Sequence, residues 1–263
     1  EMMEKSTLTI GSMGSGSDYS SFIQHLGIPS LDLGYGGEDG GGEYHSIYDS
    51  YDDYRRFKDP TFEYGVALAK TAGRAALRMA DADALPFDFR SLYKTVNGFV
   101  KDLMSKTDQM RETTATENEI IHSNFYALAN NPTEKRKVPS PKAEVPYIYF
   151  SALQHAVADL EKTTIRLSEK WNRSVMSNTD HDSMNKALYR AEQQLLAPKG
   201  LPRRGWYRHT LYAPGFYTGY GVKTIPGVRE AIEQRNWKEA QAQITVVSEA
   251  IVNLSNYLSK INP

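Results

Sequence analysis

The chain has 263 residues, 40% of them hydrophobic and 24% charged, which is enough for one large globular domain or two smaller ones. A balance of 31 Lys and Arg against 32 Asp and Glu gives no general basic field, so we expect no nucleic-acid partner. The absence of cysteine excludes disulfides and cysteine-bound zinc, and no apolar run approaches the ~20 residues of a membrane helix.

The first 45 residues are rich in glycine and contain two short predicted elements. Ser17 and Asp18 are positioned to cap a short helix over residues 20–26, which Gly27 would end. Residues 28–33 alternate apolar and polar side chains, the pattern of one strand in a larger sheet. Because a single strand leaves its backbone unpaired, its partners are either poorly signalled or outside this sequence. With no initiator Met and no signal-peptide pattern, we expect a mature or excised piece.

From residue 53 the sequence predicts helices almost to its end. Residues 60–82 begin with Pro60 and are rich in alanine, which favours a closely packed helix. Residues 88–108 predict another helix. Residues 130–146 are polar and rich in proline, which indicates a linker or an excursion from the fold.

Two C-terminal segments carry mostly apolar residues at an alternating three-four spacing, which puts each set on one stripe of a helix. The sets are Phe150, Leu153, Val157, Leu160, Thr164, Leu167 and Trp171, and then Trp237, Ala240, Ile244, Val247, Ile251, Leu254, Leu258 and Ile261. A shorter set of the same type lies between them: Met184, Leu188, Ala191 and Leu195. These patterns predict a mainly α protein built as a helical bundle. We assign the stripes to its core, and whether part of one pairs two subunits stays open.

Residues 198–227 interrupt these helices with glycines, prolines and many aromatic side chains. Because the aromatic side chains favour burial, we expect an ordered loop. Long ordered loops inside compact domains are often functional. His209 lies in this loop and is either structural or part of a site.

His45 is the most persuasive metal-ligand candidate. Asp49 follows it four residues later, and on a helix this spacing would place two zinc-ligating groups on one face. Because so short a pattern often arises by chance, the alternative is that His45 is a structural histidine and binds no metal. Tyr44 could donate a hydrogen bond to developing negative charge beside it. A catalytic zinc usually takes three protein ligands, and no complete set is visible.

Five blocks carry a family resemblance. They are GSGSDY at residues 14–19, LGIPS at 26–30, YHSIYDSY at 44–51, LPFD at 85–88, and GLP…YRH…YAP between 200 and 214. In this order they resemble the C-terminal part of the glutamate carboxypeptidase II and transferrin receptor family, which comprises M28-type dizinc peptidases and their relatives. The resemblance implies that residues 1–85 are the end of an α/β, M28-type peptidase domain. Residues 86–263 would then be a helical transferrin receptor-like dimerisation domain, with residues 130–146 as the excursion.

The resemblance also implies roles for single residues. His45 would be the last ligand of a two-zinc site, and Tyr44 would help to hold the tetrahedral intermediate. Ser15, Gly16 and Ser17 would line the substrate cleft. The other ligands and the glutamate base precede this region in such enzymes. We therefore expect a C-terminal fragment of a dizinc exopeptidase that hydrolyses peptide bonds with metal-activated water. Alone it would bind no zinc, be inactive, and form a homodimer through its C-terminal helices.

Three departures concern substrate preference. Glutamate carboxypeptidases have arginines where this chain has Asp32 and Gly34, and a lysine where Gly219 precedes Tyr220. Losing three cations removes the means of gripping an acidic side chain. We expect a peptide preference other than C-terminal glutamate, with Asp32 favouring a neutral or basic residue.

The alternative function is a non-catalytic dimerisation or receptor-like module of the transferrin receptor type, in which the fold is kept and the zinc chemistry lost. Retention of His45 with Tyr44 favours the peptidase lineage. A H-x-D motif, a Glu-Glu pair and a further Asp encoded ahead of Glu1 would decide for the enzyme. Members of the family act outside the cytoplasm, so the resemblance implies a secreted, periplasmic or cell-surface location.

Overall fold

The computed structural model describes residues 10–37, 42–129, 131, 133, 137–174 and 181–261, apart from the side chains of residues 172–174. Its helices in chain order are η1 (Ser20–Leu26), α1 (Tyr51–Asp53), η2 (Tyr54–Lys58), α2 (Glu63–Ala80), α3 (Phe89–His122), α4 (Phe125–Leu128), α5 (Ser151–Ser174), α6 (His181–Arg190), η3 (Ala191–Leu195), α7 (Pro226–Glu233) and α8 (Trp237–Ser259). Two short strands, β1 (Tyr212–Pro214) and β2 (Val222–Thr224), pair antiparallel. The predicted mainly α fold is confirmed.

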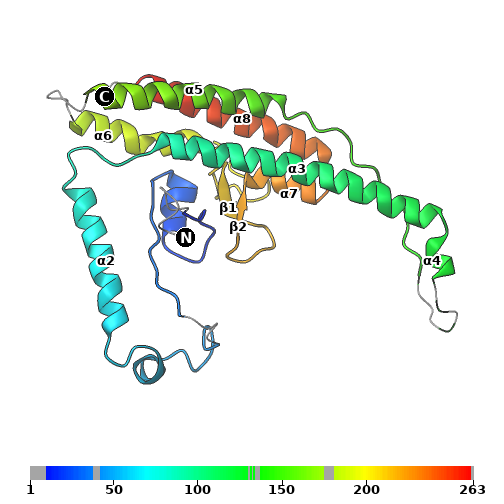
Figure 1. The fold of residues 1–263 in the computed structure, drawn as a ribbon, viewed down its shortest axis with the longest axis horizontal. Helices are drawn as coiled ribbons and strands as arrows, with labels where there is room; N and C mark the ends of the chain where they lie inside the picture. Colours follow the sequence, from blue (N-terminus) through cyan, green and yellow to red (C-terminus); the bar gives the residue numbers. More distant parts are fainter. Residues whose placement is uncertain are drawn as a thin grey trace.

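The core of the bundle lies where α5 packs against α8 and α3 (Figure 1). The two predicted stripes supply this core: Leu153 and Leu160 of α5 and Ile244 and Ile251 of α8 are fully buried in one hydrophobic cluster. Burying such side chains supplies most of the favourable free energy of a bundle, about 1.5–3 kcal/mol for each one. Trp171 and Trp237 are only partly buried at the ends of their stripes.

A second layer covers α8 with shorter helices. The predicted set around Met184 and Leu188 is buried on α6 and continues through Leu195 on η3. α7 packs on α8 as well, although the sequence placed residues 226 and 227 at the end of a loop. Pro226 opens this helix, the position at which proline is favoured.

α3 extends well beyond the predicted residues 88–108 and ends at His122. Its polar second half is held by hydrogen bonds to the irregular segment that precedes α5. The Asn118 side chain bonds the backbone of Lys142 in both directions at 2.8 Å, and Arg111 donates to the carbonyl of Val145 at 3.3 Å. The described residues 137–150 therefore lie along α3.

The N-terminal segment contains η1, which Gly27 ends in a left-handed conformation as predicted. The predicted side-chain cap is wrong, because Tyr19 is the N-cap residue and its side chain makes no capping bond. Residues 28–33 do not form the predicted strand. They pair with no strand in the part of the chain that the structure describes, and a lone extended segment gains no ladder hydrogen bonds.

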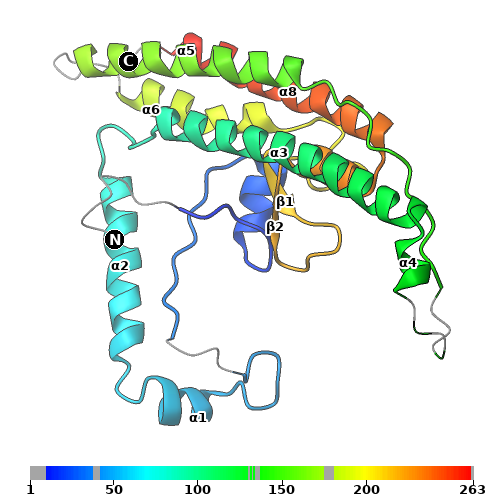
Figure 2. The ribbon, with the colours of Figure 1, turned by 45° about the vertical axis from the view of Figure 1, so that its right-hand side comes forward.

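α2 stands apart from the bundle, as Figure 1 and Figure 2 both show. Its position agrees with the predicted alanine-rich helix, but its predicted close packing is wrong, since the structure describes the whole helix and buries none of its residues. Its start is fastened locally. The buried Asp59 carboxylate accepts hydrogen bonds from the Gly65 amide (2.8 Å) and the Tyr54 hydroxyl (3.0 Å).

Candidate functional site

Tyr220 sits in the turn between β1 and β2, and its main chain lies against the N-terminal segment. The Ser15 amide donates a hydrogen bond to the Tyr220 carbonyl at 3.0 Å. A Cβ atom on Gly14 would lie 1.9 Å from that oxygen, and one on Gly16, whose φ is 92°, would lie 2.8 Å from the Tyr220 ring. Glycine permits so close an approach. Three of the predicted substrate-binding residues thus meet here.

Tyr44 brings a third segment to Tyr220. A side-chain hydrogen bond with Tyr220 raises the pKa of Tyr44 above its ordinary value, and desolvation and the charge of Asp49 act in the same direction. The Tyr44 phenol is protonated at neutral pH, as that of an ordinary tyrosine is. Its ring stacks on the next residue, His45, with 3.8 Å between centroids.

His45 lies in a series of turns, not in a helix, so the i,i+4 argument that paired it with Asp49 does not apply. Its φ of 62° places it in the left-handed region, and its side chain is exposed. Within the described residues no group of three His, Asp or Glu side chains is arranged to hold a metal ion. These residues therefore do not form a complete zinc site on their own.

Gly219 and Ser15 line one hollow of about 270 Å³, together with Arg204, Tyr207, Pro214, Gly215 and Phe216. The Arg204 guanidinium is paired with Glu230 at 2.6 Å, so its charge is already balanced. It does not replace the lysine that the resemblance places before Tyr220. Arg204 has no role predicted from the sequence, since no local spacing links it to a carboxylate 26 residues later.

Asp32 and Ser17 lie beside this cluster without joining it directly. Asp32 is exposed, and its charge adds to burial in raising the pKa of Tyr19. The Tyr19 hydroxyl in turn donates to the Ser15 carbonyl at 3.3 Å. The Ser17 carbonyl accepts from the Ser20 amide at 3.2 Å, which starts η1, while its side chain is exposed.

His209 is structural. It is fully buried, its Nδ1 accepts from the Leu211 amide at 3.2 Å, and its Nε2 therefore carries the hydrogen that reaches Glu192 at 2.9 Å. Tyr212 donates to the same carboxylate at 2.7 Å and stacks on the imidazole. Burial opposes the charge of Glu192, but the hydrogen bond and the electrostatic interaction with His209, together with the hydrogen bond from Tyr212, outweigh it and hold the pKa of Glu192 below its ordinary value. The His209 amide also bonds the Gln24 carbonyl at 3.1 Å, which ties η1 to this loop.

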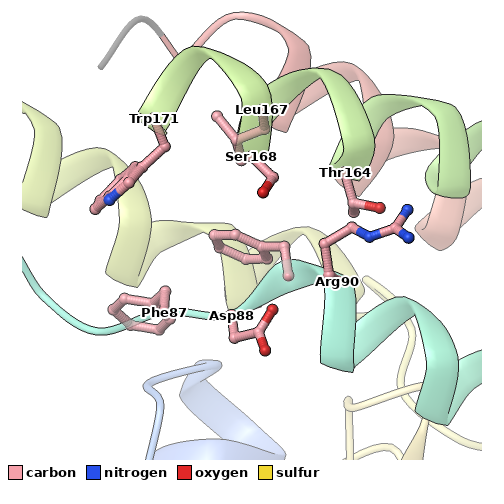
Figure 3. A pocket seen from close by; sticks show the side chains of 8 residues that line it. Phe87, Asp88, Arg90, Thr164, Leu167, Ser168 and Trp171 are labelled. Carbon is pink, nitrogen blue, oxygen red and sulfur yellow. The ribbon is translucent and has the colours of Figure 1, made fainter. Parts of the chain in front are cut away.

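The LPFD block lies away from the cleft, at the start of α3. Asp88 caps that helix by accepting from the Ser91 amide at 3.1 Å, and Asn185 accepts from the Leu85 amide at 2.9 Å. Asp88 and Arg90 face Thr164, Ser168 and Trp171 of α5 across a hollow of about 130 Å³ (Figure 3). This block therefore serves to join α3 to its neighbours.

Comparison with known proteins defines the class of the helical part. Residues 148–259 match the transferrin receptor-like dimerisation domain, so the chain carries such a domain, which is associated with self-assembly. Nearly the whole chain is also related to longer proteins. It is 31% identical over 249 residues to "Probable glutamate carboxypeptidase LAMP1" of Arabidopsis thaliana, covering 92% of this chain and 31% of that protein.

Two further relatives agree. "Probable glutamate carboxypeptidase" of Arthroderma benhamiae is 32% identical over 253 residues (95% of this chain, 30% of the relative). "Aminopeptidase NAALADL1" of Rattus norvegicus is 26% identical over 262 residues (92% and 30%). The chain thus spans about 30% of the length of these curated relatives, which are glutamate carboxypeptidase-like proteins. The resemblance that the sequence blocks suggested is confirmed. None of the described helices is long and apolar enough to cross a membrane.

Proposed function

We propose that this chain forms part of the substrate cleft of a zinc-dependent exopeptidase together with its dimerisation domain. Ser15, Gly16 and Ser17 line the cleft on one side, and Gly219 and Tyr220 line it on the other. The observation that carries the proposal is the meeting of three segments at Tyr220. That residue bonds the Ser15 amide, covers Gly16 and shares a hydrogen bond with Tyr44.

Tyr44 has the chemistry of an electrostatic stabiliser. Its phenol is protonated at neutral pH, and its interaction with Tyr220 places it next to the cleft. When its single O–H turns from Tyr220 to the substrate, it can donate to an oxygen that gains negative charge. His45 is the next residue, and we assign its imidazole as one zinc ligand, with the remaining ligands supplied by residues outside the described set. Asp32 lies beside the cleft, close enough for its charge to act on Tyr19. A negative charge there would repel an acidic substrate side chain, so we assign a preference for peptides that end in neutral or basic residues.

A non-catalytic, receptor-like module is the second candidate. It is supported by the match of residues 148–259 to the transferrin receptor-like dimerisation domain. Sequence encoded ahead of Glu1 separates the two functions, because the peptidase needs a H-x-D motif, a Glu-Glu pair and a further Asp there to supply the remaining zinc ligands and the general base. A secreted, periplasmic or cell-surface location fits either function.

The proposal is tested by measuring peptide hydrolysis. The protein used is the longest polypeptide that is encoded in frame with this chain and contains it. Tyr44→Phe is expected to lower kcat about 100-fold with little change in KM, because it removes one donor to the transition state. Tyr48→Phe is the matched control, an exposed tyrosine in the same segment. His45→Ala should lower the zinc content in metal analysis. Equal kcat for wild type and Tyr44→Phe would contradict the assigned role, and a preference for C-terminal glutamate would contradict the assigned specificity.

Self-association is a separate expectation for the chain itself. We propose a homodimer formed through the helices of residues 148–259, the part that matches the dimerisation domain. Size-exclusion chromatography with light scattering should give about twice the chain mass of 29.6 kDa. A monomer that persists at high protein concentration would contradict the homodimer.

A further inference from the structure

The turn between β1 and β2 carries Gly219 and Tyr220, and it is closed by short-range hydrogen bonds among Gly215, Thr218 and Gly221. The two strands pair over three residues each, and residues 216–221 are exposed. A two-stranded hairpin of this size is marginally stable in water at best. Its conformation therefore depends on contacts with the rest of the fold.

Arg204 and Glu230 provide such contacts at the base of the turn. Arg204 Nη2 donates to Glu230 Oε2 at 2.6 Å, and the two side chains are only 11% and 9% exposed. Arg204 Nη1 donates to the carbonyl of Pro214, while Glu230 Oε1 accepts from the amide of Phe216 at 2.5 Å. The ion pair thus holds the backbone on both sides of Gly215.

The guanidinium is further fixed by two aromatic rings. Its central carbon lies 5.5 Å from the centroid of Tyr207 and 5.4 Å from that of Phe216. Such contacts favour a cation over a neutral group of the same size. A buried ion pair with this many fixed partners acts as a geometric constraint, and breaking it leaves an unpaired charge inside the protein.

Glu230 belongs to α7, which packs on α8 within the part of the chain that matches the dimerisation domain. We propose that the Arg204–Glu230 ion pair is a positioning element that lets this domain set the place of Tyr220, and hence the geometry of the cleft. The inference rests on the proposed function, in which Tyr220 lines the cleft. Arg204 and Glu230 are positioning residues and have no chemical role in it.

Amide hydrogen exchange in the full chain, followed by NMR without any peptide or metal, tests this inference. The reporters are the amides of Gly215 and Gly221, which bond within the turn, and of Ser15, which bonds Tyr220. Arg204→Met is expected to speed exchange at all three about tenfold or more, since it leaves Glu230 unpaired. Amides in the middle of α8 should exchange as in wild type.

Three further variants separate positioning from packing. Glu230→Gln keeps an acceptor for Phe216 but loses the charge, and it should also speed exchange at the three reporters. Arg204→Lys keeps a cation beside Glu230 and should therefore exchange more slowly at the three reporters than Arg204→Met. If Arg204 only filled space, the positive charge of lysine would make no difference. Arg235→Met is the matched control, because Arg235 bonds Ala143 and Thr114 and not the turn.

Two results would overturn the inference. One is unchanged exchange at Ser15 in both Arg204→Met and Glu230→Gln. The other is an equal increase in amide exchange throughout α8, which would mean that the ion pair stabilises the whole fold and not the turn in particular. Neither result depends on catalysis. A failure of this inference, seen by hydrogen exchange, is therefore distinguishable from a failure of the proposed peptidase function, seen by peptide hydrolysis.

Discussion

His209→Phe is expected to lower the free energy of unfolding at pH 7 by about 2–4 kcal/mol, because it removes a donor to a buried carboxylate. Phenylalanine keeps the aromatic stack on Tyr212 but leaves Glu192 with one hydrogen bond in place of two. The Leu211 amide also loses its acceptor. Urea unfolding followed by circular dichroism measures the change.

The pH dependence of this variant should be opposite to that of the wild type. In the wild type the pKa of Glu192 is lowered, so its contribution to stability is present above its unfolded pKa and is lost as the pH falls through the folded value. In His209→Phe burial outweighs the remaining hydrogen bond, and the folded pKa lies above the unfolded one. The destabilisation should therefore shrink as the pH falls from 7 towards 5.

The double variant His209→Phe with Glu192→Gln is the control for this prediction. It removes the titrating carboxyl, so the pH-dependent part of the destabilisation should disappear while the packing change remains. A destabilisation by His209→Phe that is the same at pH 5 and pH 7 would show that Glu192 does not carry the effect.

Leu160→Ala is expected to lower the free energy of unfolding by about 2–5 kcal/mol, since it leaves a cavity among rigid neighbours on α5 and α8. Leu160 is 0% exposed, in the middle of the stripe that faces α8. Leu128→Ala is the matched control, because that leucine is 81% exposed and should change stability by no more than about 0.5 kcal/mol. Similar values for the two variants in urea unfolding would contradict the assigned core.

The fold was predictable where a periodic pattern coincides with burial. The stripes through Leu160 and Ile251 placed α5 and α8 correctly. A three-four spacing that continues over a long segment indicates an amphipathic helix and no other regular structure. α7 was missed because eight residues give too short a period to stand out from the loop before them. The packing of α2 was predicted wrongly. A high alanine content indicates a helix that is able to pack closely, but it does not indicate whether another element lies beside that helix.

The candidate site was predictable only through the family resemblance. Ser15, Tyr44 and Tyr220 are far apart in the sequence, and no local spacing relates them. Local spacing instead suggested a His45–Asp49 pair, which the turns around His45 do not support. Arg204 and Glu230 were missed for the same reason, since their pairing exists only in the folded chain.

The pKa of Tyr44 tests most directly the claim that Tyr220 joins three segments into one site. It can be followed in the chain by ¹³C NMR of the tyrosine Cζ atoms, with Tyr44→Phe identifying the resonance and circular dichroism confirming the fold at each pH. Because the hydrogen bond to Tyr220 raises this pKa, Tyr220→Phe should lower it towards the ordinary value, whereas Tyr48→Phe should leave it unchanged. The same Tyr44 pKa in wild type and Tyr220→Phe would mean that the two residues do not meet, and would contradict the site.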